Sequence, residues 1–102
     1  MKDITVQELK EKLDKQDNFI LIDVREPHEY EEYNIGGELI PLGSVPEAVP
    51  AMLEDHKDEE VIVYCRSGSR SAAAQHMLQQ GGMTKVRNLE GGVLAWIEAF
   101  EK

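Results

Sequence analysis

Two apolar segments, residues 19–24 and 61–64, dominate the hydrophobic pattern of this chain. Only Asp23, near the end of the first, interrupts them. Apolar runs without polar alternation are typical of parallel strands buried on both faces, so we expect two central strands here. Shorter segments at 39–40 and 85–88 predict two further strands.

The segments between these strands carry helix signals. Thr5 and Glu8 form a capping-box pattern, in which each side chain can bond the backbone N–H of the other residue. Pro50 should kink or split the helix that contains it. The expected helices cover residues 6–15, 28–33, 45–53, 69–80 and 91–100. Alternating strands and helices indicate an α/β fold, a short parallel sheet of about five strands with helices on both faces, in one domain over residues 1–102.

Composition narrows the class of protein. The chain has 102 residues and a net charge of −9, which argues against binding to nucleic acid or to an anionic membrane. The first residues lack the apolar core of a leader peptide, and no apolar run approaches the ~20 residues of a membrane span. A lone cysteine, Cys65, cannot form an internal disulfide. These features predict a cytoplasmic protein, which we expect to be a monomer.

Cys65 lies where the second apolar run meets a polar loop and a helix-forming stretch. Backbone N–H groups of such a loop, with the N-terminus of the helix, form a concave site for anions. Free cysteine titrates near ~8.5, and such surroundings lower the pKa to roughly 3.5–7.5, which makes the thiol a nucleophile at neutral pH. The alternative is an inert, buried structural cysteine.

Three segments resemble the signatures of the rhodanese-like sulfurtransferases in their small single-domain form. They are Leu-Ile-Asp-Val-Arg-Glu-Pro-His-Glu-Tyr at 21–30, Cys-Arg-Ser-Gly-Ser-Arg-Ser at 65–71 and Val-Arg-Asn-Leu-Glu-Gly-Gly-Val-Leu-Ala-Trp at 86–96. One segment departs from the family pattern. Members commonly carry Gly-His-Ile-Pro-Gly-Ala after the first signature, whereas residues 33–38 here are Tyr-Asn-Ile-Gly-Gly-Glu. We expect an altered loop there, and with it an altered partner surface.

The resemblance implies sulfur transfer through a persulfide on Cys65. Six residues, from Cys65 to Arg70, form a loop like that of the sulfurtransferases, whereas phosphatases and arsenate reductases of the same fold have one residue more. A six-residue ring of N–H donors suits a single outer sulfur atom, and a tetrahedral oxyanion needs a wider ring. The residues expected to bind substrate and cradle the persulfide are Arg66, Ser67, Gly68, Ser69, Arg70 and Ser71.

Individual side chains have further expected roles. Arg66 should attract an anionic donor such as thiosulfate, and Arg70 either contacts substrate or bonds inward to hold the loop. Asp23 should support the loop by pairing with an arginine or with loop N–H groups, and Arg25 follows the same logic. Trp96 is expected in the core. Glu29, Glu31 and Glu32 should form a solvated acidic face.

The expected partners are a small anionic sulfur donor and a thiophilic acceptor, either cyanide, a small thiol or a thioredoxin-like protein. A persulfide relay that serves one partner protein is the alternative function, and a phosphatase is the least favoured. The spacing of His28, His56 and His76 relative to Cys65 does not suit a metal site, so we expect no metal and no cofactor.

Overall fold

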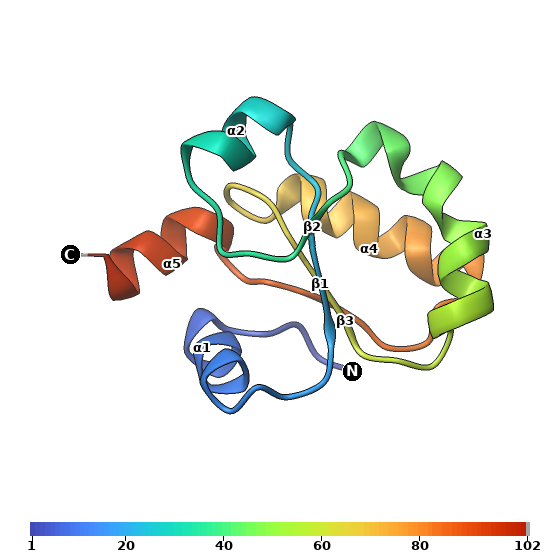
Figure 1. The fold of residues 1–102 in the computed structure, drawn as a ribbon, viewed down its shortest axis with the longest axis horizontal. Helices are drawn as coiled ribbons and strands as arrows, with labels where there is room; N and C mark the ends of the chain where they lie inside the picture. Colours follow the sequence, from blue (N-terminus) through green and yellow to red (C-terminus); the bar gives the residue numbers. More distant parts are fainter. Residues whose placement is uncertain (102) are drawn as a thin grey trace.

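A parallel sheet of four strands forms the centre of the computed structural model, which describes residues 1–101 (Figure 1). The strands are β1 (Ile20–Asp23), β2 (Glu38–Leu39), β3 (Val61–Tyr64) and β4 (Val86–Asn88). Their spatial order in the sheet is β2-β1-β3-β4. All three neighbouring pairs are parallel, and β1 and β3 align from Ile20 opposite Val61 to Asp23 opposite Tyr64.

The expected number of about five strands is slightly too high. An isolated parallel bridge between Ile4 and Leu89 takes the place of a fifth strand. Ile4 donates its N–H to the Asn88 carbonyl at 3.0 Å, and its own carbonyl accepts from Glu90 at 2.9 Å. The helix that begins at Val6 limits this pairing to a single residue.

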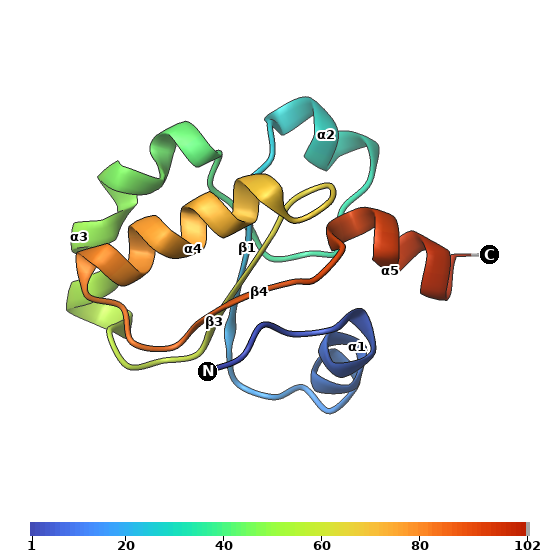
Figure 2. The same cartoon turned by 180° about the vertical axis from the view of Figure 1, so that it is seen from behind.

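Within residues 1–101, five α-helices and one 3-10 turn surround the sheet. Helices α1 and α5 cover one face, α3 and α4 cover the other, and α2 lies beyond the carboxyl ends of the strands (Figures 1 and 2). Their bounds are α1 Val6–Asp14, α2 Pro27–Glu32, η1 Leu42–Ser44, α3 Val45–His56, α4 Ser69–Gly81 and α5 Gly92–Phe100.

Helices cover both faces of strand β3, which explains why its sequence is apolar without alternation. Val61 and Val63 pack among side chains of α3 and α4, whereas Ile62 and Tyr64 pack against α1 and α5. All four residues are fully buried. Trp96 lies in the second of these cores, as expected, with its ring 4.7 Å from that of Phe100.

One local expectation for the helices needs correction. The Thr5 hydroxyl accepts from the Glu8 N–H at 3.2 Å, but the Glu8 carboxylate bonds Arg87 at 2.9 Å rather than completing the capping box. Pro50 is expected to kink or split its helix. It lies inside α3, which runs without a break from Val45 to His56, so the helix is not split.

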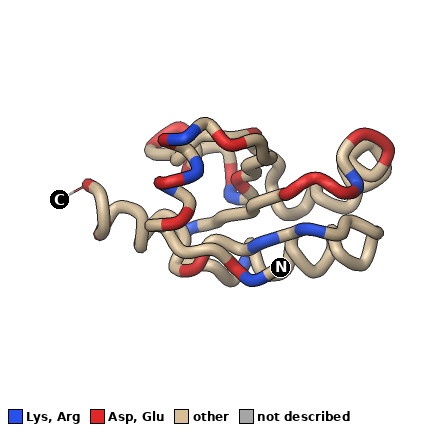
Figure 3. The backbone as a smooth tube through the Cα atoms, turned by 90° about the horizontal axis from the view of Figure 1, so that it is seen from below, with Lys and Arg blue, Asp and Glu red and all other residues tan. Residues whose placement is uncertain are grey.

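Acidic residues are spread over many segments of the backbone rather than collected on one (Figure 3). Within the described part of the chain, no helix has the length and apolar character needed to cross a membrane.

Candidate active site

Cys65 directly follows β3 at the carboxyl edge of the sheet, and its side chain faces into a loop. The sulfur lies 3.1 Å from the Gly68 nitrogen, 3.4 Å from the Ser71 nitrogen and 3.3 Å from the Ser71 hydroxyl oxygen. Only 1% of the residue is exposed. The loop therefore presents several hydrogen-bond donors to one nearly enclosed sulfur atom.

Gly68 provides the turn that aims these donors. Its φ of +116° lies in the left-handed region, where a side chain is strained. The residue caps the N-terminus of α4, and its carbonyl accepts from the Ala72 N–H at 3.0 Å. The loop and the first turn of α4 thus form one continuous concave surface around Cys65.

Burial raises the pKa of the Cys65 thiol, but hydrogen bonds oppose it. Donors from the Ser71 hydroxyl and from the N–H groups of Ser71, Gly68 and Ser67 outweigh burial and leave the pKa below its ordinary value. The lowered pKa favours the thiolate, which is the reactive form of cysteine.

The start of α5 closes the loop from the other side. Val93 donates its N–H to the Cys65 carbonyl at 2.9 Å, and Leu94 donates to the Arg66 carbonyl at 3.0 Å. A Cβ atom on Gly92 would lie 2.4 Å from the Cys65 carbonyl oxygen and 2.6 Å from that of Arg66. Glycine at this position therefore allows the close approach of helix and loop.

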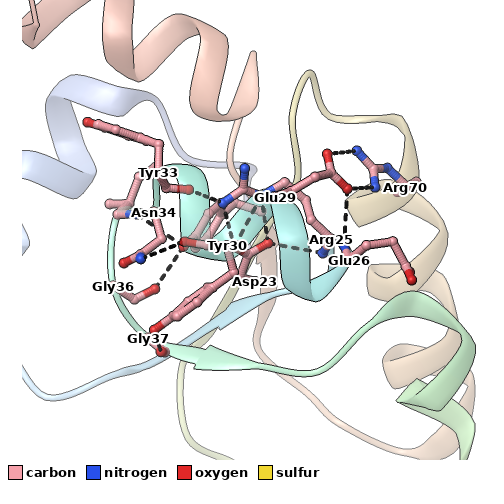
Figure 4. A network of polar contacts seen from close by, with 12 residues as sticks. Asp23, Arg25, Glu26, Glu29, Tyr30, Tyr33, Asn34, Gly36, Gly37 and Arg70 are labelled. Atoms are coloured by element: carbon pink, nitrogen blue, oxygen red, sulfur yellow. Dashed lines mark hydrogen bonds and ion pairs between the residues drawn. The ribbon is translucent and has the colours of Figure 1, made fainter.

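The remaining loop side chains divide into two groups. Arg66, Ser67 and Ser69 are exposed at the mouth of the loop. Arg70 instead turns to Glu29 on α2, with nitrogen to oxygen distances of 2.7 and 2.9 Å (Figure 4). This bond joins the loop to α2 and does not run back into the loop itself.

Glu29 corrects the expectation of a wholly solvated acidic face. Its carboxylate also accepts from the Glu26 N–H at 3.1 Å. The bond from Arg70 lowers the pKa of Glu29 to about 2 against the opposing effect of burial, so the group is ionised at neutral pH. Glu31 and Glu32 are exposed, as expected.

Asp23 and Arg25 form a buried ion pair beneath this region (Figure 4). The Arg25 Nη2 donates to the Asp23 carboxylate at 2.7 Å and to the Tyr33 carbonyl, also at 2.7 Å. The Arg25 backbone N–H bonds the same carboxylate at 3.0 Å. The pair connects the end of β1 to the segment after α2 and does not contact the Cys65 sulfur.

The unusual segment 33–38 is organised by Tyr64, which sequence reasoning treated only as a strand residue. The Tyr64 hydroxyl donates to the Gly36 carbonyl at 2.8 Å and accepts from the Ile35 N–H at 3.2 Å. Burial is the main reason that its pKa is raised. Gly37 passes so close to the sheet that a Cβ atom would lie 2.4 Å from the Leu21 carbonyl oxygen. The signal in the sequence that could have indicated this role is the polar hydroxyl of Tyr64 at the end of an otherwise apolar strand.

Asn88, at the end of β4, is a second residue near the loop that sequence reasoning missed. Its side-chain oxygen lies 2.6 Å from the Ser71 hydroxyl, and its side-chain nitrogen donates to the Gly68 carbonyl at 3.1 Å. A polar residue that ends a buried strand, as Asp23 does, was again the signal. Among the described residues, no cluster of three or more His, Cys, Asp or Glu is placed to hold a metal ion.

Comparison with known proteins identifies the family. The rhodanese-like domain matches residues 5–99. The chain belongs to the rhodanese-like domain family. A sulfurtransferase of Allochromatium vinosum is 37% identical over 95 residues, which cover 92% of this chain and 86% of that protein. A putative sulfurtransferase of Bacillus subtilis is 38% identical over 97 residues, which cover 94% and 90% of the respective chains.

Solved structures share this architecture. The crystal structure of a rhodanese-like domain protein from Staphylococcus aureus superposes with a TM-score of 0.81 at 34% identity, covering 94% of this chain and 91% of that one. The resemblance between sequences and the resemblance between folds thus agree, and sulfur transfer is the general activity of the named relatives of this rhodanese-like domain.

Proposed function

We propose that this rhodanese-like domain is a sulfurtransferase that moves sulfane sulfur from an anionic donor such as thiosulfate to a thiophilic acceptor through a persulfide on Cys65. One observation carries the proposal. The Cys65 sulfur faces the Gly68 and Ser71 N–H groups inside a six-residue loop, at 3.1 and 3.4 Å. Such donors stabilise a thiolate and can equally stabilise negative charge on an outer sulfur atom bonded to it.

In the loading step, the Cys65 thiolate attacks the outer sulfur of thiosulfate. A bond forms between the two sulfur atoms, the S–S bond of thiosulfate breaks, and sulfite departs with the electron pair. Sulfite is already a stable anion, so the step does not require a general acid. The exposed Arg66 side chain at the mouth of the loop attracts the donor and offsets its charge.

In the discharge step, an outside nucleophile attacks the outer sulfur and Cys65 leaves as the thiolate. Cyanide gives thiocyanate, and a thiol gives a new persulfide on the acceptor. Because Cys65 is the only cysteine in the sequence, no second thiol of this chain can resolve the persulfide as a disulfide. The acceptor, a small thiol or the cysteine of a thioredoxin-like protein, must come from outside.

A relay that serves one partner protein is the second candidate. Leu94 is a large apolar residue that is 43% exposed, and its N–H bonds the Arg66 carbonyl, so it lies beside the mouth of the loop. An exposed leucine at this position suits contact with a protein acceptor. Phosphatase activity has less support, because the loop is one residue short and its last arginine is already paired with Glu29.

Intact mass spectrometry tests the proposal. Thiosulfate should add one sulfur atom to the wild-type protein, cyanide should remove it, and Cys65→Ser should show neither change. Ser67→Ala, which alters an exposed hydroxyl of the same loop, is a matched control that should still acquire the sulfur. Turnover of thiosulfate by Cys65→Ser at the wild-type rate would refute the assignment. Rapid cycling with cyanide favours the enzyme, and a persulfide released only to a protein favours the relay.

A further inference from the structure

The Ser71 hydroxyl has more hydrogen-bond acceptors within reach than it has protons. Its oxygen lies 3.3 Å from the Cys65 sulfur, 3.2 Å from the Gly68 carbonyl oxygen and 2.6 Å from the Asn88 side-chain oxygen. A serine hydroxyl has one proton and can donate to one of them at a time. The three contacts therefore compete.

The orientation of the Asn88 amide decides which of the three acceptors receives the proton of the Ser71 hydroxyl. A carbonyl can only accept, so the Asn88 nitrogen must face the Gly68 carbonyl, 3.1 Å away, and the Asn88 oxygen must face Ser71. That oxygen is also only an acceptor. At 2.6 Å, the Ser71 hydroxyl must donate to Asn88, and its lone pairs are then turned toward the sulfur.

This direction of the hydroxyl suits the thiol, which can donate its proton to the lone pairs of Ser71. The thiolate keeps the N–H donors of Gly68 and Ser71 but receives no bond from a hydroxyl that points to Asn88. When Cys65 loses its proton, the hydroxyl can stabilise the negative sulfur only by turning away from Asn88. Ser71 is fully buried and Asn88 is 8% exposed. Bulk water therefore has little access to replace the bond of the hydroxyl to Asn88 or its bond to the sulfur.

We propose that Asn88 is a positioning residue that controls the direction of the Ser71 hydroxyl and thereby decides when Ser71 donates to the Cys65 sulfur. Asn88 holds the proton while Cys65 is a thiol or a persulfide. As an acceptor attacks the outer sulfur and the S–S bond breaks, negative charge develops on the Cys65 sulfur. The hydroxyl then turns to it and assists its departure.

The competition has a chemical purpose within the proposed sulfur transfer. A thiolate with a very low pKa is a good leaving group but a weaker nucleophile, so loading and discharge make opposite demands on Cys65. Competition from Asn88 weakens the bond from Ser71 to the thiolate, which keeps the sulfur nucleophilic for loading while the same bond still assists its departure. The inference rests on Cys65 as the nucleophile, and it holds for any donor or acceptor.

The pH profile of Cys65 alkylation by iodoacetamide tests the role of Asn88 without any sulfur transfer. The lone cysteine makes the readout unambiguous. Asn88→Leu removes the competing acceptor at similar volume, so the midpoint should move down by about 1 pH unit. Asn88→Asp adds a negative charge that holds the Ser71 proton more firmly, so the midpoint should rise by a similar amount.

A double-mutant cycle separates this role from simple support of the loop. Because Asn88 acts through Ser71, Asn88→Leu should not shift the midpoint further in a Ser71→Ala background. The nearby charges stay the same in the Asn88→Leu and Ser71→Ala variants: Arg70 is paired with Glu29, Arg25 is paired with Asp23, Arg66 is exposed, and the Asp3 carboxylate accepts from the Asn88 backbone N–H.

Three results would overturn the inference. They are an unchanged or raised midpoint in Asn88→Leu, a lowered midpoint in Asn88→Asp, and an equal shift of Asn88→Leu with and without the Ser71 hydroxyl. Asn88→Asp keeps the shape of the side chain and replaces the leucine variant if that variant does not fold. Because its charge alone also repels a thiolate, its shift should be smaller in a Ser71→Ala background, and an equal shift there would likewise overturn the inference. Failure of thiosulfate loading with the predicted midpoints would instead contradict the proposed function alone.

Discussion

Arg70 and Glu29, which are 41 residues apart in the sequence, form a two-pronged ion pair that joins the start of α4 to α2. Their side chains are 35% and 19% exposed, so the pair is partly shielded from water. The charge of Arg70 is thus matched by a carboxylate. The loop arginine left at the mouth is Arg66.

Glu29→Gln should therefore strengthen binding of anionic donors. The substitution keeps the shape of the side chain but releases the charge of Arg70, so the KM for thiosulfate should fall severalfold, an electrostatic effect of ~1 kcal/mol. Steady-state kinetics at low ionic strength measure it. Glu32→Gln, an exposed change of equal charge at the end of the same helix, is the control. An equal effect in both variants would show that net charge, not the pair, is responsible.

Arg66→Ala should weaken donor binding, and added salt should slow the donor step of the wild-type protein. The net charge of −9 repels an anion, so a local positive group must attract it, and its field is screened over ~8 Å at physiological ionic strength. Stopped-flow measurement of persulfide formation against salt tests this. Lys85→Ala, an exposed loss of equal charge that precedes β4, is the control. Salt-independent rates in wild type and Arg66→Ala would contradict the expected role.

Gly92→Ala should damage both stability and activity. The added methyl group would overlap the carbonyl oxygens of Cys65 and Arg66, so α5 or the loop must move, at a cost of about 2–4 kcal/mol. Denaturant unfolding and thiosulfate loading measure the two effects. Gly43→Ala is the control, because a Cβ atom there meets nothing within 4 Å. Wild-type loading by Gly92→Ala would show that the close contact is dispensable.

The persulfide should persist in buffer without acceptor and discharge at a rate that rises with acceptor concentration. The sulfur atom of Cys65 is nearly enclosed, and the sequence contains no second cysteine. Loading with thiosulfate, removal of the donor and mass analysis against increasing thiol test this. Rapid loss without acceptor, or a rate that ignores its concentration, would contradict a protected persulfide.

The parts of this structure that sequence reasoning predicted correctly depend on short-range pattern. The apolar run at 61–64 alone indicates a strand buried on both faces, and β3 covers those residues. The helix expected over residues 69–80 is α4, Ser69–Gly81, and Gly82 caps it with a φ of +115°. Both features are set by neighbours in sequence, through burial and backbone conformation.

The features that the sequence did not predict depend on how segments far apart in the sequence meet in the fold. Glu29 looks like any surface carboxylate until α2 is placed beside α4. Asn88 reaches Ser71 only because β4 pairs in parallel with β3 and ends next to the loop. The three residues of β4 are too short a pattern to predict that register from the sequence. The apolar pattern itself indicates four strands, and within the described residues the structure adds to them only the single bridge between Ile4 and Leu89.

The contact between α5 and the loop sets an order of events during synthesis. Cys65 leaves the ribosome well before Val93 and Leu94, whose N–H groups bond the carbonyls of Cys65 and Arg66. Until those residues emerge and dock, the loop lacks this support. The thiol therefore acquires its complete surroundings only after α5 has emerged and docked, and until then the growing polypeptide carries a cysteine that is not fully activated.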